Sequence, residues 1–568
     1  MTEQAPSPAE SEALVPLHLL AKEAPVSVET ESAKSGTGKD AEFSWTNRSF
    51  GFWMIIAANF TSDFLSAFDM SVVSTALPTI VQDLGGNDFI WVGSAYALAG
   101  SAIVPLCGGL VSIWGRKPIL LILMTLFAIG SAVAGSAKSM NVLIVGRAFQ
   151  GFGGCGALTV TEIIYADIIP LPQRGIMQGM ASVVWAFATG IGPPLGGILA
   201  NAGAWRWLFY LNLPIFGIAA ALEIVFLHNT PPEATVRQKL RRMDWTGSAI
   251  VVGGSAAFIL ALSWGGIRFA WSDSQTLVPL IIGIVALLSF MFYERFCAKE
   301  PIVPWSVFAT RSSIMGYIGT SIHGLVMYVA IYYLPVYYQA VKLASTIRSG
   351  VYMLGFSMFI TPAAMVCGVS FMVFNRYLPQ NYVGWVLMVA GSGVLAVLGV
   401  DSSKAAIISA PIMLGMGVGM GWTMTQFPIL ASLPYSNNAH ALSFFTFVRN
   451  LSQTMGVAIG GSILQNLLTH KLPASYIAQL PSGVSFAYSA IPTLNSLDPA
   501  TQFLVRKAFA DSLKLMWLVM IGISGIGLVS VFFMKEIPMR HDLDEQWALE
   551  QKEKKNTQAQ GGGETVSG

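Results

Sequence analysis

Long apolar runs recur along this chain and constrain its fold more than any other feature of the sequence. Between about residues 49 and 535 they are each roughly 20 residues long, enough for a helix rising 1.5 Å per residue to cross about 30 Å of hydrocarbon. We count about fourteen such runs. Only 11% of the residues are charged, against about 25% in an ordinary soluble protein, so charge is too scarce to cover a water-facing surface. The sequence therefore predicts an all-α integral membrane protein with about fourteen transmembrane helices.

Two polar, basic, proline-containing segments, at 228–245 and 295–311, interrupt the regular succession of apolar runs. They divide the predicted spans into groups of six, two and six. The predicted divisions are a polar N-terminal tail, a first six-span region, a linker, a two-span insert, a second six-span region and a polar C-terminal tail: 1–48, 49–228, 229–245, 246–297, 298–535 and 536–568. The N-terminal tail is expected to be disordered and lacks the pattern of a signal peptide, and the C-terminal tail is equally polar.

An external loop is predicted at about 468–510, before the last span. Within it, Asp498 followed by Pro499 is typical of an N-cap and a first helical position, which predicts a short external helix.

The basic residues of the loops predict the orientation of the chain. An even number of spans places both tails on one side. In the first half, the loops on that side hold most of the basic residues, while the opposite loops hold Lys138 and Arg206. Basic residues favour the cytoplasmic side, so both tails are predicted to be cytoplasmic, although the second half does not follow this bias. The plasma membrane is the expected location, with the vacuolar membrane as the alternative.

Patterns typical of soluble enzymes lack their structural context here. The glycine-rich stretches at 151–156 and 415–421 lie inside apolar runs and follow no strand, so they do not predict a nucleotide site. The four cysteines are scattered, and a net charge of +2 gives no reason to expect nucleic acid. We expect no enzyme activity, no cofactor, no metal and no obligate protein partner; the expected partners are lipid, protons and a small molecule.

Ionisable residues inside the predicted spans are candidates for function, because each costs about 2.5–3.5 kcal/mol to insert. The candidates are Asp63, Asp69, Arg147, Glu223, His323 and Arg449.

Asp69 and Arg147 are predicted to lie at similar depth on two spans, which allows an ion pair. Such a pair either fixes two helices permanently or opens and closes during a functional cycle.

Asp63 lies nearer the midplane, with no obvious cation at its depth. An unpaired carboxylate in that environment is easier to protonate than one in water, which is the property that a proton carrier needs. Two other interpretations stay open: a hydrogen bond from Asn59 or Ser66, or exposure to a water-filled cavity. Asp63 and Asp69 are both candidates for proton coupling.

A further group of polar residues could line a central cavity. Arg449 either faces such a cavity beside Asn450 and Gln453 or is a packing cation satisfied by carbonyl groups. His323 and Glu223 are weaker candidates, since a lone histidine on a helix is more often a packing residue. The cavity candidates are Asn59, Ser66, His323, Arg449, Asn450 and Gln453.

Several motifs together resemble the major facilitator superfamily, over about residues 50–535. GGLVSIWGRKPILL, after the second span, resembles the loop motif of that family, and GRAFQGFGGCGAL resembles its arginine-containing motif. GIGPPLGG resembles the antiporter motif of its drug exporters, and further stretches resemble fungal toxin-efflux members of the fourteen-span drug:proton antiporter branch. The residues that match are Gly108, Gly115, Arg116 and Lys117 in the loop motif, and Gly192, Pro193, Pro194, Gly196 and Gly197 in the antiporter motif.

The resemblance implies two six-helix bundles around a cavity, with two additional spans, and proton-coupled export of small, mostly apolar organic compounds by alternating access. Two alternatives are a vacuolar basic amino acid transporter and, less favoured, a transporter-like nutrient sensor. One departure stands out: Ser112 and Ile113 occupy positions where the loop motif has an acidic and often a basic residue. We therefore expect Arg116 and Lys117 to act through helix ends and lipid headgroups instead.

Overall fold

The computed structural model describes Trp45 and residues 48–84, 90–227, 234–266, 269–478 and 490–539. Most of the two predicted tails, part of the linker and the middle of the predicted external loop therefore lie outside the described residues.

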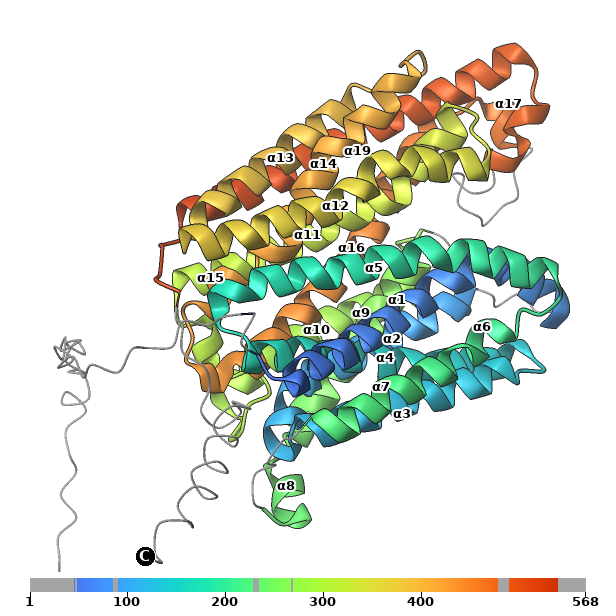
Figure 1. Cartoon of the computed structure of the whole chain (residues 1–568). Helices are drawn as coiled ribbons and strands as arrows, with labels where there is room; N and C mark the ends of the chain where they lie inside the picture. The colour runs from blue at the N-terminus through green and yellow to red at the C-terminus, as the bar shows by residue number, and fades with distance from the viewer. Residues whose placement is uncertain are drawn as a thin grey trace, which may run out of the picture. The chain divides into compact units, whose positions relative to one another are not determined.

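The first group of helices packs mainly on itself (Figure 1). Within it α1 packs against α5 and α7, and α4 packs against α2 and α3. The helices are α1 (Phe50–Leu84), α2 (Ile90–Trp114), α3 (Arg116–Gly135), α4 (Met140–Ile168), α5 (Leu171–Asn201), α6 (Trp207–Tyr210) and α7 (Asn212–Phe226).

The second group of helices also packs mainly on itself: α14 packs against α12 and α13, and α11 packs against α16 and α19. Its long helices are α11 (Arg311–Val336), α12 (Thr346–Phe374), α13 (Leu378–Ala396), α14 (Lys404–Met424), α16 (Asn438–Lys471) and α19 (Pro499–Phe532). Its short elements are η3 (Tyr337–Val341), α15 (Phe427–Leu430), η4 (Tyr435–Asn437), α17 (Ala474–Ile477) and η5 (Ile491–Ser496).

Two long helices lie between these groups in the chain. α9 (Trp245–Trp264) packs against α10 (Ser274–Phe296), and also against α2 of the first group and α16 of the second. The short helices α8 (Val236–Arg242) and η2 (Trp305–Phe308) flank this pair in the chain.

Side-chain caps explain where several helices begin. Asp244, Asp273, Ser345, Ser403 and Asp498 each accept a hydrogen bond from a backbone amide in the first turn of the helix that follows. These bonds satisfy amides that have no partner inside a helix.

Asp498 and Pro499 begin a helix as predicted, but that helix is continuous with the last predicted span rather than separate from it. α19 continues without a break for 34 residues to Phe532. The connection before it therefore spans only 472–498, which is shorter than the predicted loop at 468–510.

Among the described residues, 10 helices are long and apolar enough to cross a membrane. The helices α1, α4, α13 and α16 also lie at predicted spans but are not among these ten; α1, α4 and α16 carry the ionisable residues considered below. The exact number of spans thus stays a prediction. The sole β-type pairing in the described part of the chain is one bridge between Gly265 and Phe269.

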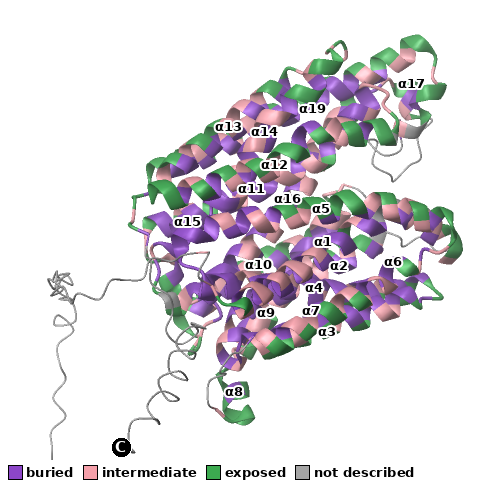
Figure 2. Cartoon of the chain, viewed as in Figure 1, coloured by how far each residue is buried: buried purple, intermediate pink, exposed green. Residues whose placement is uncertain are grey.

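The outer helix faces are apolar and exposed (Figure 2). On α10, Ile281, Val285, Leu288 and Phe292 are each more than half exposed. An apolar surface of this extent is unfavourable in water and suits contact with lipid chains.

Candidate functional site

Asp69 and Arg147 meet in the interior of the first helix group. Nη1 of Arg147 lies 2.5 Å from Oδ2 of Asp69, and both side chains are buried. The other carboxylate oxygen, Oδ1, accepts hydrogen bonds from Nε2 of Gln150 at 2.8 Å and from Nδ2 of Asn212 at 2.9 Å. The structure thus places the two predicted charge partners in contact, within a network whose amide members the sequence analysis missed.

Arg147 is held by three further groups. Its Nε donates to the carbonyl of Val92 at 3.1 Å, its Nη1 donates to Oε1 of Gln150 at 2.9 Å, and its guanidinium carbon lies 4.6 Å from the ring centroid of Tyr96. Gln150 follows Arg147 by three residues, so helical spacing was a signal that could have identified it. Asn212 lies on another helix and offered no such signal.

Asp63 lies nearby in the chain but has a different environment. Its carboxylate accepts hydrogen bonds from Oγ1 of Thr161 at 3.1 Å and from the Tyr165 hydroxyl at 3.2 Å, and the side chain is 4% exposed. Asp63 forms no ion pair with any described residue. A hydroxyl can donate to a carboxylate and accept from a carboxylic acid, so this site can hold either protonation state.

The residues expected beside Asp63 do not bind it. Ser66 donates instead to the carbonyl of Gly154 at 3.5 Å. Asn59 is fully buried, and neither polar atom of its side chain has a hydrogen-bond partner among the described residues. The hydrogen-bonded interpretation of Asp63 therefore needs different donors, Thr161 and Tyr165, both on α4.

The other ionisable candidates occupy two places, because His323 and Arg449 both lie against Trp422. Glu223 is buried and accepts a hydrogen bond from Ser62 at 3.2 Å. His323 is fully buried with Nε2 2.9 Å from the carbonyl of Val418, so it packs between helices and lines no open space in this structure. Arg449 is 3% exposed and donates from Nη2 to the carbonyl of Trp422 at 3.2 Å.

Arg449 is also enclosed by aromatic rings, with its guanidinium carbon 4.3 Å from the ring centroids of both Trp422 and Phe445. Of its two polar neighbours, Gln453 is 9% exposed and Asn450 is half-buried. Asn59, Ser66, His323, Arg449 and Gln453 are all buried, so of the six cavity candidates only Asn450 is half-buried.

Glu162 is an ionisable residue that the sequence analysis missed. It lies on α4, and its Oε2 accepts a hydrogen bond from Thr446 of α16 at 3.2 Å. The sequence carried the signal that would have identified it, because Glu162 is a charged residue within the largely apolar stretch TVTEIIY, as the selected candidates are within their own apolar runs.

The GIGPPLGG segment forms part of the contact between α5 and α1. α5 continues as a helix through Pro193 and Pro194. Gly192 is buried against α1, where a Cβ atom would lie 2.0 Å from Oγ of Ser71. Gly196 is buried as well, whereas a Cβ atom at Gly197 would meet nothing within 4 Å. Close helix contact thus requires glycine at Gly192 but not at Gly197.

The loop motif makes contacts that differ in part from the expectation. Nε of Arg116 lies 2.8 Å from the carboxylate of Asp167, at the end of α4, so Arg116 has an acidic partner on a neighbouring helix. Lys117 donates to the carbonyl of Ile224 at 2.7 Å, in the last turn of α7, which is the helix-end contact that was expected. Ser112 donates to the carbonyl of Gly108 within its own helix, and Ile113 is buried.

The two helix groups meet near one end of their helices. Thr361 of α12 donates to the carbonyl of Ser182 of α5 at 3.3 Å, and Ser443 of α16 donates to the carbonyl of Val104 of α2. Gly175 lies against Gly368, where a Cβ atom on either would clash with the other's backbone. These residues lie in the first half of α5 and α16 and in the second half of α2 and α12.

Burial along α5 agrees with this closed end. Residues 171–182 are all buried or half-buried, whereas exposed residues recur from Val183 onward, including Phe187, Ile191 and Ile198. The beginning of α1 lies at this end too, because Phe50 packs on Phe226 at the end of α7, next to Ile224, whose carbonyl accepts from Lys117 just after α2. The residues after α19 lie here as well, because the hydroxyl of Tyr377, just after α12, donates to the carbonyl of Lys535. We call it the closed end.

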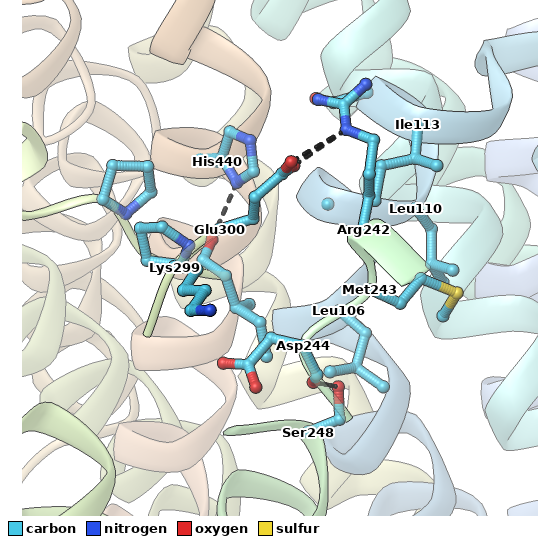
Figure 3. A pocket seen from close by; sticks show the side chains of 15 residues that line it. Leu106, Leu110, Ile113, Arg242, Met243, Asp244, Ser248, Lys299, Glu300 and His440 are labelled. Carbon is cyan, nitrogen blue, oxygen red and sulfur yellow. Dashed lines mark hydrogen bonds and ion pairs between the residues drawn. The ribbon is translucent and has the colours of Figure 1, made fainter. Parts of the chain in front are cut away.

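A cavity of about 310 Å³ lies at the closed end, and neither Asp63 nor Asp69 lines it (Figure 3). Its walls come from the last turns of α2, the start of α9, residues 299–304 and His440 of α16. Arg242 points toward Glu300, with Nε 2.9 Å from Oε2 in a half-exposed ion pair. Nδ1 of His440 lies 2.7 Å from the carbonyl of Ile302. Among the predicted site residues, none lines this cavity.

Fungal transporters match this sequence over most of its length. The chain is 35% identical to the efflux pump FUS6 of Gibberella moniliformis over 90% of this chain and 92% of that protein. It is 34% identical to the MFS-type efflux pump MMF1 of Pseudozyma antarctica, over 91% and 96% of the two chains. It is 32% identical to the acurin A biosynthesis cluster MFS-type transporter of Aspergillus aculeatus, over 88% and 92%.

Solved transporter structures share the fold. The human organic anion transporter MFSD10 (TETRAN) aligns with a TM-score of 0.55 at 11% identity, over 86% of this chain and 100% of that one. A double-tryptophan mutant of XylE aligns with a TM-score of 0.56 at 13% identity, over 88% and 98% of the two chains. The sequence profile of the Major Facilitator Superfamily matches residues 60–457. The chain therefore belongs to the Major Facilitator Superfamily.

Proposed function

We propose that this protein exports small, mostly apolar organic compounds, such as toxins or secondary metabolites, in exchange for protons. The relatives named as efflux pumps support the direction of transport, and the transporter of the acurin A cluster supports a secondary metabolite as the class of substrate. Because these relatives are transporters, transport rather than catalysis is the proposed activity.

The environment of Asp63 is the observation that carries the proposed proton coupling. Two hydroxyl groups hold this buried carboxylate and no described cation neutralises it, so a proton can be gained or lost there without breaking an ion pair. Asp69 is a poorer candidate, because protonation would remove the partner of Arg147.

Alternating access follows from the placement of the contacts between the helix groups. In the proposed mechanism, α1–α7 and α11–α19 rock as two bundles, with up to fourteen spans in total and both termini cytoplasmic. The closed end is then the cytoplasmic end, and the structure corresponds to an outward-facing state in the plasma membrane. The GIGPPLGG segment would seal the first bundle through the contact between Gly192 and α1.

The proton gradient supplies enough energy for this exchange. One proton entering down about 100 mV releases about 2.3 kcal/mol, and each pH unit adds about 1.4 kcal/mol, so one proton supports a gradient of tens- to hundreds-fold.

The vacuolar basic amino acid transporter remains the alternative, and it requires carboxylates that are free to bind a cationic substrate. Asp69 is paired with Arg147, and Asp63 and Glu223 are buried with hydrogen-bond donors. These contacts do not favour that alternative.

Inside-out membrane vesicles from a drug-sensitive host that expresses the protein provide the test. With an acidic lumen, we expect vesicles that contain the protein to accumulate compounds from an apolar panel, and a protonophore to abolish the accumulation. Vesicles from the host without the protein are the control. Accumulation that does not depend on the proton gradient would contradict proton coupling. Uptake of arginine or lysine alone would support a basic amino acid transporter.

A further inference from the structure

Glu162 bridges the interface between the two helix groups. It lies on α4, and its carboxylate accepts a hydrogen bond from Thr446 on α16 of the other group, at 3.2 Å. Glu162 is half-buried, so it lies at the interface rather than in the interior of its own group. Within α4 it is only six residues from Ile168, which puts it near the closed end.

Arg449 is the cation that faces Glu162. It lies on α16, three residues after Thr446, and therefore on the same helix face. Glu162 and Arg449 attract each other electrostatically across the interface. Nε of Arg449 is buried without a hydrogen-bond partner among the described residues, so the guanidinium has an unused donor.

On its other side, Glu162 is close to the candidate proton site. The preceding residue, Thr161, donates to Asp63, and Tyr165 on the next turn donates to the same carboxylate. Glu162 acts electrostatically on Asp63 as a like charge. Ser62, beside Asp63 in the chain, donates to Glu223. Three carboxyl groups thus extend from the interior of the first helix group to its interface.

We propose that Glu162 and Arg449 form a charge link across the interface at the closed end, and that Glu162 is the positioning residue through which this link senses the proton on Asp63. This proposal rests on the proposed function for its role in transport, whereas the link itself does not.

The physical argument concerns what happens when the closed end opens. While it is closed, Arg449 offsets the charge of Glu162. Once the bundles separate there, Thr446 and Arg449 leave with α16, and Glu162 and Asp63 face each other as uncompensated like charges in a poorly solvated region. Holding a proton on this pair relieves the repulsion. Protonation therefore favours opening of the closed end, and loss of the proton favours its closure.

The charged and titratable groups around Glu162 leave Arg449 as its cationic partner. α16 contributes Arg449 and Thr446, and α1 contributes Asp63. α4 itself contributes Tyr165, α7 contributes Glu223 beside Tyr165, and α11 contributes His323 beside Arg449. α2, which packs against both α4 and α16, has no charged residue between Ile90 and Trp114. Arg449 is thus the cation available to Glu162 at this place.

Opening of the closed end on protonation, and its closure on loss of the proton, is the direction of coupling that an exporter needs. A proton that arrives from outside would break the link and let the closed end open to the cytoplasm. Release of the proton, with substrate bound, would restore the link and return the protein to the outward-facing state.

Cysteine cross-linking across the closed end tests the link directly. Ser182→Cys and Thr361→Cys are introduced into the full chain after its four native cysteines have been replaced, because Thr361 bonds to the carbonyl of Ser182 only where α5 meets α12. The rate of cross-linking with a short bifunctional thiol reagent in membranes reports how often this end is closed.

We expect Glu162→Gln to lower the cross-linking rate at neutral pH by about threefold, less than the effect of charge pairs in direct contact across interfaces. Arg449→Gln should have the same effect, and the double variant no larger one. Acidification should lower the rate in the parent and leave Glu162→Gln unchanged. Glu162→Asp keeps the charge and should restore part of the cross-linking rate that Glu162→Gln loses. This comparison does not require the Arg449→Gln variant to fold.

Glu300→Gln is the matched control, because it removes a carboxylate from a half-exposed pair at the same end, where such pairs contribute little. An unchanged cross-linking rate in Glu162→Gln, or equal losses in Glu162→Gln and Glu300→Gln, would overturn the proposed link. Neither outcome depends on export, so a failure of the link and a failure of proton-coupled export can be distinguished.

Discussion

Asp69 and Arg147 form an ion pair in which the acid is 0% and the base 3% exposed, with 2.5 Å between Oδ2 and Nη1. Two amide side chains, from Gln150 and Asn212, also bond to the carboxylate. Three helices, α1, α4 and α7, therefore depend on one buried charge pair.

Removing either charge alone should destabilise the protein more than removing both. Asp69→Asn and Arg147→Gln each leave an uncompensated buried charge, which typically costs about 3–5 kcal/mol, whereas the double variant leaves none. A double-mutant cycle on thermal unfolding in detergent measures the coupling. The half-exposed pair of Asp83 and Arg206 is the control and should show about 0–1 kcal/mol. Strictly additive effects at Asp69 and Arg147 would contradict the prediction.

Asp63→Asn should abolish the dependence of transport on the proton gradient without loss of folded protein. The amide keeps the size of the side chain and can still bond to Thr161 and Tyr165, but it cannot exchange a proton. In inside-out vesicles, accumulation should rise with luminal acidity for the parent and stay flat for the variant. Asp83→Asn is the matched control. A variant that still accumulates compounds uphill with the parental pH dependence would exclude Asp63 as the coupling residue.

Gly192→Val should separate α5 from α1 and inactivate the protein. A Cβ atom there would lie 2.0 Å from Oγ and 2.9 Å from Cβ of Ser71; the hydroxyl can rotate away but the Cβ atom cannot, so one helix must move. Gly190→Val is the matched control, because a Cβ atom at Gly190 meets nothing within 4 Å on the same helix. Export and leakage of protons, measured at equal abundance, should change only for Gly192→Val. Equal activity of the two variants would show that the close contact has no role in transport.

Gly115→Ala should destabilise the turn between α2 and α3. Gly115 has a φ of 93° and a ψ of 160°, a region that is essentially restricted to glycine, so alanine adds strain of about 1–3 kcal/mol. Gly217→Ala in α7 is the control, with nothing within 4 Å of the added Cβ atom. Thermal unfolding should distinguish the two; a parental melting temperature for Gly115→Ala would contradict the backbone argument.

Asp498 should make the first turn of α19 sensitive to acid. The backbone amide of Thr501 donates to its carboxylate and lowers the pKa of Asp498 below the ordinary 3.8. A lowered pKa means that the cap stabilises the helix above pH 3.8 and that this contribution is lost as the pH falls through the folded pKa. Amide exchange at Thr501 should therefore accelerate in acid relative to Asp498→Asn, because asparagine caps without titrating. Identical exchange profiles would contradict this role.

The sequence by itself determined the features that depend on the composition and spacing of one segment. Apolar length predicted the helices, because backbone groups in lipid must be paired within their own segment. Asp498 and Pro499 predicted where α19 begins, since capping involves only the neighbouring turn. Charges within apolar runs identified Asp63, Asp69, Arg147 and Arg449 for the same local reason.

Only the tertiary structure decided which side chains meet. Asp63 bonds to Thr161 and Tyr165 rather than to Asn59 or Ser66, because α4 packs against α1 there and its hydroxyl groups reach the carboxylate. Asn212 joins the Asp69 pair from 143 residues away. Thr446 reaches Glu162 across the interface, over 284 residues. Spacing along one helix says which residues share a face, but the partner of that face is set by how the helices pack, and that packing depends on the whole chain.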